Sequence, residues 1–409
     1  MKILVVSQYY WPENFRINDL VSGLSDRGHK VTVLTGIPNY PAGRFFPGYG
    51  VFRRPEGEDK TNVPVVRVPL IARGVDNKWR LFLNYLSFAL SASLLGPLCC
   101  RDGYDVIFVF EPSPITVGIP ALVMKFFRRC PVVFWVQDLW PESLSATGVV
   151  SSKKMLGAVA CLVRGIFKGC DLILATSRSY IPSIVSHNVP EAKVRYFPQS
   201  VEALYRPLSS DQIVSEKKML PGGFIVMFAG NIGTAQSFET IIEAAEMLRD
   251  ERQVNIVVIG DGRRFLWLKE EIERRALEHR VFLLGRQPLE KMPAFFACAD
   301  ALLVSLRKDP LFALTVPGKV QSYMACGKPI IAALEGEGAQ LVNEAKAGLT
   351  CAPGDAEALA STIRTMAGLG AKERGEMGAA GYQYFKQHFD RDMLIDRLEG
   401  WMADLRGAE

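Results

Sequence analysis

Short apolar runs alternate with longer stretches of helical periodicity along most of the chain. Helical periodicity is clear in Phe15–Arg27 and Gly118–Phe127. Strands that are apolar on both faces and separated by helices are typical of a parallel sheet covered on both sides. The first half therefore predicts a doubly wound α/β domain. Its expected strands are Lys2–Ser7, Lys30–Thr35, Val63–Leu70, Asp105–Phe110, Pro131–Val136 and Asp171–Ala175.

The same pattern restarts after a connection rich in proline and polar residues at Asn188–Gly223. A helix is expected at Phe238–Arg249, and the chain from Asp355 to its end is predicted to be helical. Doubly wound sheets bind ligands at the carboxyl ends of their strands, and two facing sheets would enclose a cleft. The expected strands of this second domain are Phe224–Ala229, Val254–Ile259, Val281–Leu284, Ala301–Ser305 and Ile330–Ala333.

The restart divides the chain into two domains of similar length. We place the N-terminal Rossmann-like domain at residues 1–200, a linker at 201–222 and the C-terminal Rossmann-like domain at 223–385. The last helix, about 386–409, is expected to pack back on the N-terminal domain.

Composition narrows the class of protein. With 49% hydrophobic and 22% charged residues, the chain is globular rather than disordered. The net charge of +5 comes without a continuous basic stripe, which argues against a dedicated nucleic-acid binder but suits an anionic ligand or membrane surface. The eight cysteines form no CxxC motif, and the apolar N-terminus turns polar at Ser7, too early for a signal peptide. We therefore expect a cytoplasmic protein.

The segment Leu81–Cys100 contains no charged residue. About 20 apolar residues can span a bilayer, but Asn84, Gly96 and Pro97 interrupt this run. Three interpretations stay open: a buried helix packed on a sheet, a helix that dips into a membrane surface, and a true span.

Several familiar motifs are missing. The first strand ends in Ser7-Gln8-Tyr9-Tyr10-Trp11 and lacks the G-x-G-x-x-G of a dinucleotide site, which argues against NAD- or FAD-dependent dehydrogenases. The aromatic side chains there would line a cleft or pack internally. The four histidines have no metal-ligand spacing, so no metal site is predicted. There is also no P-loop or G-x-S-x-G elbow.

Three turns could hold phosphate. Gly230–Thr234 follows a predicted strand and precedes a helix, so backbone N–H groups would face an anion. Gly260–Arg264 is similar, although by itself it reads as an ordinary turn. Thr315–Lys319 opens another helix and adds a lysine, which binds phosphate as a point charge. A surface lysine is the alternative for Lys319.

Carboxylates follow two neighbouring strands of the first domain. Glu111 ends one strand, and Asp138 and Glu142 come directly after the next. At the carboxyl edge of a sheet they are acid/base candidates, although side chains of this kind also stabilise helix N-termini.

Taken together, these residues resemble bacterial glycosyltransferase family 4, which has the two-domain GT-B fold. The resemblance covers nearly the whole chain and is closest to the O-antigen, capsule and colanic-acid branch that includes L-fucosamine (N-acetyl-L-fucosamine) transferases. It rests on Tyr9–Glu13, Asn39–Pro41, Gly48-Tyr49, Val136–Pro141, Ala229–Gly233, Ile259–Gly262 and Thr315–Pro329.

The resemblance implies retaining transfer from a nucleotide sugar, usually a UDP-sugar, with no obligatory metal or other cofactor. The C-terminal domain would bind the donor and the N-terminal domain the acceptor. Lys319 and Arg307 would supply positive charge to the diphosphate, and Asp138 would orient a sugar. The other donor-binding residues implied are Gly230, Asn231, Gly233, Thr234, Gly260, Arg286, Gln287, Thr315, Gly318, Glu337 and Gly338.

The chain departs from the family pattern at several positions. The usual pair of glutamates falls at about Leu314 and Ser322, and Gln137 stands where a histidine is common. The missing glutamate pair keeps a non-catalytic nucleotide-sugar-binding protein open as an alternative. A UDP-sugar 2-epimerase also stays open, because it has two facing Rossmann-like halves and could use Glu111, Asp138 and Glu142 as acid/base groups.

Acceptors in this branch are typically polyprenyl-diphosphate-linked sugars at the cytoplasmic face of the inner membrane. Leu81–Cys100 and the loop with Arg44–Phe46 and Arg53-Arg54 are the expected sites of peripheral membrane contact.

Overall fold

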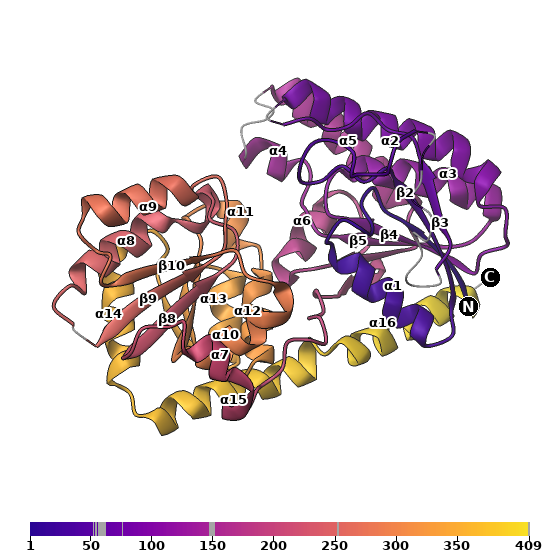
Figure 1. Cartoon of the computed structure of the whole chain (residues 1–409). Coiled ribbons are helices and arrows are strands. Elements are labelled where there is room, and N and C mark those ends of the chain that lie inside the picture. Colours follow the sequence, from indigo (N-terminus) through magenta and orange to yellow (C-terminus); the bar gives the residue numbers. More distant parts are fainter. Residues whose placement is uncertain are drawn as a thin grey trace. The chain divides into compact units, whose positions relative to one another are not determined.

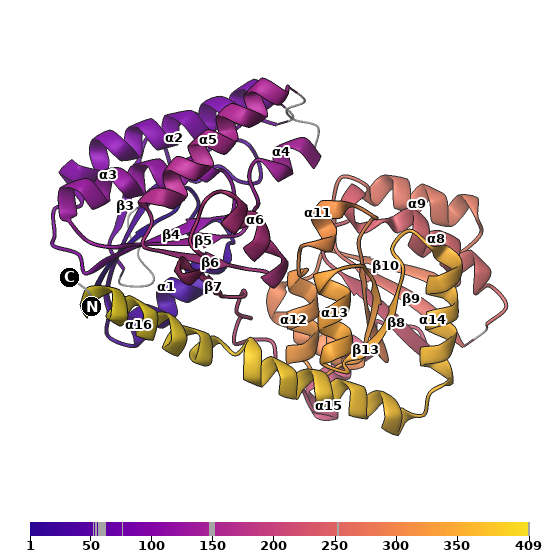
Figure 2. The same cartoon turned by 180° about the vertical axis from the view of Figure 1, so that it is seen from behind.

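The computed structural model describes residues 1–51, 53, 55, 63–75, 77–146, 152–251 and 253–407. Arg54, from the basic loop, lies outside these residues. The chain divides into two compact units (Figures 1 and 2). Unit 1 comprises Met1–Gln199 and Asp392–Glu409, and unit 2 comprises Ser200–Arg391. Each unit is an α/β domain built on a parallel sheet, as the alternation of apolar runs and helices predicts.

Within the described residues, unit 1 has a seven-stranded parallel sheet in the order β3-β2-β1-β4-β5-β6-β7. The central strands are rich in Val, Ile and Phe, and every residue of β4 and β5 is buried. Burial on both sides explains why these strands read as continuous apolar runs. The strands are β1 (Lys2–Val6), β2 (Lys30–Gly36), β3 (Val65–Val68), β4 (Val106–Glu111), β5 (Val132–Val136), β6 (Leu172–Ala175) and β7 (Val194–Tyr196).

Helices cover both faces of this sheet (Figures 1 and 2). Helices α2, α3 and α5 lie on one face, and α3 packs against both of its neighbours. Helices α1 and α16 lie on the other face, where their apolar side chains share a core with β1, β4 and β5. The helices are α1 (Arg16–Asp26), α2 (Lys78–Cys99), α3 (Gly118–Arg128), α4 (Glu142–Ala146), α5 (Lys153–Gly169), α6 (Ile181–Ser186) and α16 (Arg391–Gly407).

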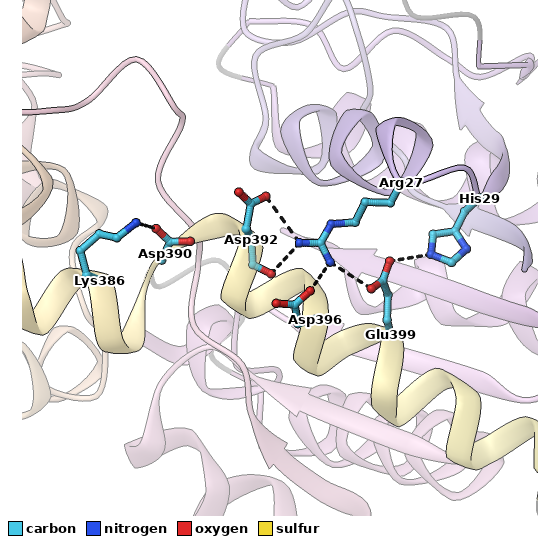
Figure 3. A network of polar contacts seen from close by, with 7 residues as sticks. All are labelled: Arg27, His29, Lys386, Asp390, Asp392, Asp396 and Glu399. Carbon is cyan, nitrogen blue, oxygen red and sulfur yellow. Dashed lines mark hydrogen bonds and ion pairs between the residues drawn. The ribbon is translucent and has the colours of Figure 1, made fainter.

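A polar network joins α16 to the turn that follows α1 (Figure 3). The Arg27 guanidinium pairs with Asp396, and its Nη1 lies 3.0 Å from an oxygen of Glu399. Arg27 also donates to the Asp392 backbone carbonyl over 2.9 Å. The second carboxylate oxygen of Glu399 lies 2.6 Å from Nε2 of His29. These contacts fix the orientation of α16, which is distant in sequence from the rest of unit 1 and packs on it through apolar side chains.

Unit 2 has, within its described part, a six-stranded parallel sheet in the order β10-β9-β8-β11-β12-β13. One core lies between the sheet and α8, α9 and α14, and a second lies between the sheet and α10, α12, α13 and α15. The strands are β8 (Phe224–Ala229), β9 (Val254–Ile259), β10 (Val281–Gly285), β11 (Ala301–Ser305), β12 (Ile330–Ala333) and β13 (Gly348–Cys351). The helices are α7 (Val214–Lys217), α8 (Phe238–Met247), α9 (Phe265–Arg274), α10 (Met292–Cys298), α11 (Pro310–Ala313), α12 (Gly318–Ala325), α13 (Glu337–Glu344), α14 (Ala356–Gly368) and α15 (Ala371–His388).

Two edge strands were not predicted. β7 lies inside the segment Asn188–Gly223, which the proline content predicts to be a connection, and β13 lies outside every predicted strand. Both are short and only partly buried, so neither shows the apolar run that identified the inner strands. The C-terminal region also contains more than one helix: α15 belongs to unit 2 and ends at His388, whereas α16 begins at Arg391.

The uncharged segment Leu81–Cys100 forms most of α2, which is long and apolar enough to cross a membrane by length and composition alone. One side of the helix packs on unit 1, and the amide of Asn84 is buried there. Gln8 Nε2 donates to Asn84 Oδ1 over 2.7 Å, and Asn84 Nδ2 donates to the Ile71 carbonyl over 2.6 Å. The helix is therefore held to the domain along one side.

Candidate functional site

The connections of each sheet change direction at one point. In unit 2 the chain moves outward from β8 to β9 and β10, then returns to β11 on the other side of β8. The loops that follow β8 and β11 therefore separate at the carboxyl ends of these strands, where open α/β sheets bind ligands. Unit 1 has the same arrangement at β1 and β4.

The turns after β8 and β9 touch each other through their glycines. A Cβ on Gly260, whose φ is +148°, would lie 1.8 Å from the Gly230 carbonyl oxygen. Gly230, with φ of +135°, donates from its N–H to the Ile259 carbonyl over 2.8 Å. Only glycine fits so close an approach of two backbones. The two predicted glycine turns are thus one joined surface rather than separate loops.

Further contacts shape the Gly230–Thr234 turn. The Ile232 N–H donates to the Asp261 carbonyl over 2.9 Å, and the Gly233 N–H donates to Gln236 Oε1 over 3.2 Å. A short 3₁₀ turn begins at Thr234. The side chain of Asn231 lies against Gly233, where an added Cβ would be 2.6 Å from its Nδ2. The turn is held in place by hydrogen bonds and contacts of its own polar groups.

Lys319 lies beside this turn, in the first turn of α12. Its Nζ is 3.6 Å from the centroid of the Phe228 ring, on β8. A Cβ on Gly230 would be 2.6 Å from Lys319 Cε, so the glycine makes room for the lysine. Within the described residues the ammonium has no hydrogen bond or ion pair. Burial lowers the pKa of Lys319 to about 7, although the residue as a whole is partly exposed.

This environment is unfavourable for a cation without a ligand. The positive end of the α12 dipole is at the same place as the ammonium, and a ring face stabilises a cation less than a carboxylate does. A buried charge without a partner costs free energy. A bound anion would relieve both effects, because the helix N–H groups and the lysine would face it together.

Contacts to β8 and α13 hold α12 and the loop that precedes it. The Tyr323 hydroxyl accepts a hydrogen bond from the Ala229 N–H over 3.2 Å, which fixes α12 against the end of β8. A Cβ on Gly338 would lie 3.1 Å from Pro317 Cδ and 3.4 Å from the Thr315 carbonyl oxygen. Gly338 therefore allows α13 to approach the loop that carries Thr315 and leads into α12 at Gly318.

The other predicted donor residues lie around this centre or farther along the sheet. Arg307 follows β11, and its N–H donates to the Ala235 carbonyl over 2.9 Å, which brings its loop to the Gly230 turn. Its guanidinium pairs with Asp309 at 3.1 Å. Arg286 and Gln287 follow the edge strand β10, and Arg286 is exposed. Glu337 opens α13.

Unit 1 brings Glu111 and Asp138 together at the ends of β4 and β5. The Asp138 N–H lies 3.4 Å from Oε2 of Glu111, and Oε1 has no partner among the described residues. Burial raises the pKa of Glu111 well above its usual range, and the charge of Asp138 raises it further. Burial also raises the pKa of Asp138, whose carboxylate accepts a hydrogen bond from Ser143. Glu142 accepts instead from Ser183 over 2.6 Å.

Sequence reasoning missed the role of Glu13. Its carboxylate is buried and accepts from the N–H groups of Asn39 and Tyr40 over 2.8 and 2.7 Å, which joins two loops of unit 1. Burial raises its pKa to about 7. Tyr9 from the aromatic run is buried and stacks on Phe15, with ring centroids 4.9 Å apart. The aromatic run at 9–11 was a signal for this cluster, but its packing partners are not adjacent in sequence.

The two positions of the missing glutamate pair have structural roles. Ser322 is buried and donates to the Gly318 carbonyl over 3.2 Å, and Leu314 lies between α11 and α12. No group of three His, Cys, Asp or Glu side chains suited to a metal ion occurs among the described residues.

Two doubly wound domains, the second with a helix N-terminus and a lysine beside a glycine turn, fit a glycosyltransferase of the GT-B class. Family comparisons agree: residues 14–199 match the model of the glycosyl transferase 4-like domain, and residues 223–368 match that of glycosyl transferases group 1. Both models describe glycosyltransferase domains and together they cover most of the chain, which is therefore a glycosyltransferase built from these two domains.

Two curated relatives match over comparable lengths. The chain is 26% identical over 340 residues to "Putative colanic acid biosynthesis glycosyl transferase WcaI" of Escherichia coli K12, covering 80% of this chain and 82% of that protein. It is 28% identical over 348 residues to "Probable glycosyltransferase WbjE" of Pseudomonas aeruginosa, covering 82% and 81%. Among solved structures, Anabaena Alr3699/HepE in complex with UDP superimposes with a TM-score of 0.73 at 16% identity, covering 99% of this chain and 100% of that one.

Proposed function

We propose that this enzyme transfers a sugar from a UDP-sugar with retention of configuration, and that unit 2 binds the donor diphosphate. The observation that carries the proposal is the ammonium of Lys319, which has no hydrogen bond or ion pair in the described part of the chain and lies between Phe228 and the Gly230 turn at the start of α12. The diphosphate of a uridine nucleotide is an anion that would pair with this ammonium. The HepE structure, which contains UDP, supports the choice of nucleotide.

The chemistry follows from this geometry. As the bond between the sugar C1 and the diphosphate oxygen breaks, negative charge grows on the diphosphate, and Lys319 and the α12 N–H groups stabilise it. Arg307 adds positive charge from the loop after β11. The acceptor hydroxyl forms the new bond to C1 on the same face, and its proton passes to the departing diphosphate. Asp138 in unit 1 orients a sugar. No obligatory metal or cofactor enters this scheme.

The donor and acceptor are proposed more narrowly. The donor sugar is an N-acetylated amino sugar such as N-acetyl-L-fucosamine, and the acceptor is a polyprenyl-diphosphate-linked glycan at the cytoplasmic face of the inner membrane. The name of the WcaI relative supports a role in cell-surface polysaccharide synthesis. The epimerase and non-catalytic alternatives are less favoured than transfer, because both halves of the chain match models of glycosyltransferase domains.

Thermal stability without added metal tests nucleotide binding first. A saturating ligand at ~100 times its Kd adds ~2.7 kcal/mol of stability, so UDP should raise Tm by several degrees while ADP and NAD should not. A shift with GDP alone would move the donor to GDP-sugars, and no shift with any nucleotide would refute the site.

Product analysis with UDP-sugars and lipid-linked acceptors then tests the reaction. A new glycosidic linkage is expected. A changed free nucleotide sugar would favour the epimerase, and no change in either would favour the non-catalytic alternative.

A further inference from the structure

The outer surface of unit 1 formed by α2, α3 and α5 is unusual for a soluble domain. Helix α2 buries Asn84, Phe88, Ala89, Ala92 and Gly96 against the domain, yet its opposite side is also apolar. Helices that are apolar on all sides are normally buried or inside a membrane. The residues of this outer side are exposed, and at helical spacing they form one continuous stripe: Trp79, Phe82, Leu83, Leu86, Leu90, Leu94 and Leu98.

Neighbouring helices extend the apolar surface. Phe126 and Phe127 at the end of α3 are exposed, by 78% and 56%, as is Met155 on α5 by 57%. Between α3 and α5 lies a groove of about 670 Å³ whose lining residues, such as Leu122, Phe127 and Leu162, are all apolar. An apolar area shared by three helices exceeds the scattered exposed residues that are normal on a monomer.

The charges on these three helices have a single sign. α2 contains two basic residues, α3 two and α5 four, and none of the three helices contains Asp or Glu. Lys125 on α3 pairs with Asp171, which follows α5, over 2.6 Å. Exposed Lys153, Arg164 and Lys168 on α5 form no ion pair within the described residues. Apolar side chains combined with unpaired basic ones suit the headgroup region of an anionic bilayer.

We propose that this three-helix surface, the outer faces of α2, α3 and α5, binds the surface of an anionic membrane. The helix α2 lies along the membrane rather than across it. Spanning would pull Asn84 away from Gln8 and Ile71, and leave buried amide groups without partners. At ~1.5 Å per residue, α2 lays an apolar stripe roughly 30 Å long on the membrane. The inference deepens the proposed function, because a lipid-linked acceptor would be met at that surface.

The test is flotation of the full chain with vesicles, without detergent. The protein should float with vesicles of mixed phosphatidylcholine and phosphatidylglycerol, and less with phosphatidylcholine alone or at high salt. The double variant Leu94→Glu/Phe126→Glu should lose flotation. Leu266→Glu is the matched control, since Leu266 on α9 of unit 2 is 72% exposed and Leu94 is 71% exposed. Arg164→Ala and Lys168→Ala should each weaken binding about fivefold.

Other outcomes would overturn the inference. Protein that stays at the bottom of the gradient, or a double variant that floats like the wild type, refutes a membrane surface here. A wild-type dimer that the double variant converts to a monomer would show that a second copy of the chain covers the surface. Thermal stabilisation by UDP, measured on the same samples, shows that each variant is folded. It also separates this inference from the proposed function, because vesicle binding and UDP binding can each fail without the other.

Discussion

Replacing Lys319 by methionine tests the donor site most directly. The pKa of this lysine falls from 10.5 to about 7 because the ammonium is buried. A shift of that size sets an upper limit of ~5 kcal/mol on the cost of keeping the charge in the ligand-free protein. Partial exposure of the residue reduces this cost, so we expect Lys319→Met to stabilise the free protein by ~1–3 kcal/mol at pH 6. Urea unfolding measures this directly.

The same variant should lose UDP. A hydrogen bond that involves a charged group contributes ~1.5–3 kcal/mol, so UDP should bind about 10- to 150-fold more weakly to Lys319→Met. Lys328→Met is the matched control, because Lys328 is also partly buried with a lowered pKa but donates to the Ala297 carbonyl over 2.9 Å. That variant should lose stability and keep its UDP affinity. A Lys319→Met protein that is less stable at pH 6, or that binds UDP like the wild type, would refute the reasoning.

The lowered pKa also predicts how stability and binding depend on pH. Between pH 7 and 10.5 the unfolded chain binds the lysine proton and the folded chain does not, so the contribution of Lys319 to stability rises with pH in that window. UDP favours the charged form, so binding near pH 8 should take up almost one proton. Calorimetry in buffers of different ionisation enthalpy measures the uptake, which should vanish in Lys319→Met.

Three further predictions concern the fold. Arg27→Ala should destabilise the protein by ~1–2 kcal/mol in urea because it breaks the partly buried network on α16, whereas Arg274→Ala, from an exposed pair, should leave stability almost unchanged. Burial raises the pKa of Glu13 to about 7, so its contribution to stability is full below pH 4.5 and is lost as pH rises to 7, by at most ~3 kcal/mol. Glu13→Gln should flatten the dependence of the unfolding free energy on pH between 4.5 and 7. An unchanged pH dependence would exclude Glu13 as its source. Gly260→Ala should lower the free energy of unfolding by roughly 2–4 kcal/mol and weaken UDP binding, because the added Cβ meets the carbonyl of Gly230 in the neighbouring turn. Gly375→Ala is the control: its Cβ meets open space on a helix, so it should be neutral or stabilising. Equal effects of the two substitutions would contradict this account.

The strands in the middle of both sheets could be predicted because burial on two faces leaves a continuous apolar run. β4 and β8 are entirely buried, and their predicted bounds agree with the structure to within one residue. The edge strands β7 and β13 could not be found in this way, because a half-exposed strand of three or four residues carries almost no hydrophobic signal.

The residues of the candidate site also fall into two groups: those that local sequence features predict and those that only the fold brings together. Glycine turns after predicted strands, and a lysine at a predicted helix start, are local features, so Gly230, Gly260 and Lys319 were found from the sequence. The Phe228 ring under the ammonium and the Tyr323 hydroxyl that fixes α12 were not found, because both depend on contacts across about 90 residues of chain.

The sequence by itself determined the two α/β domains, the residues at the ends of their strands and the absence of charge in α2. These properties follow from local periodicity and from the order of residue types. Only the tertiary structure decided that Glu111 and Asp138 share one environment, that Glu13 joins two loops, and that α2 is apolar on a packed side and an exposed side. Burial and proximity arise from packing between segments far apart in the chain, and a hydrophobicity pattern does not record which side of a helix the rest of the fold will cover.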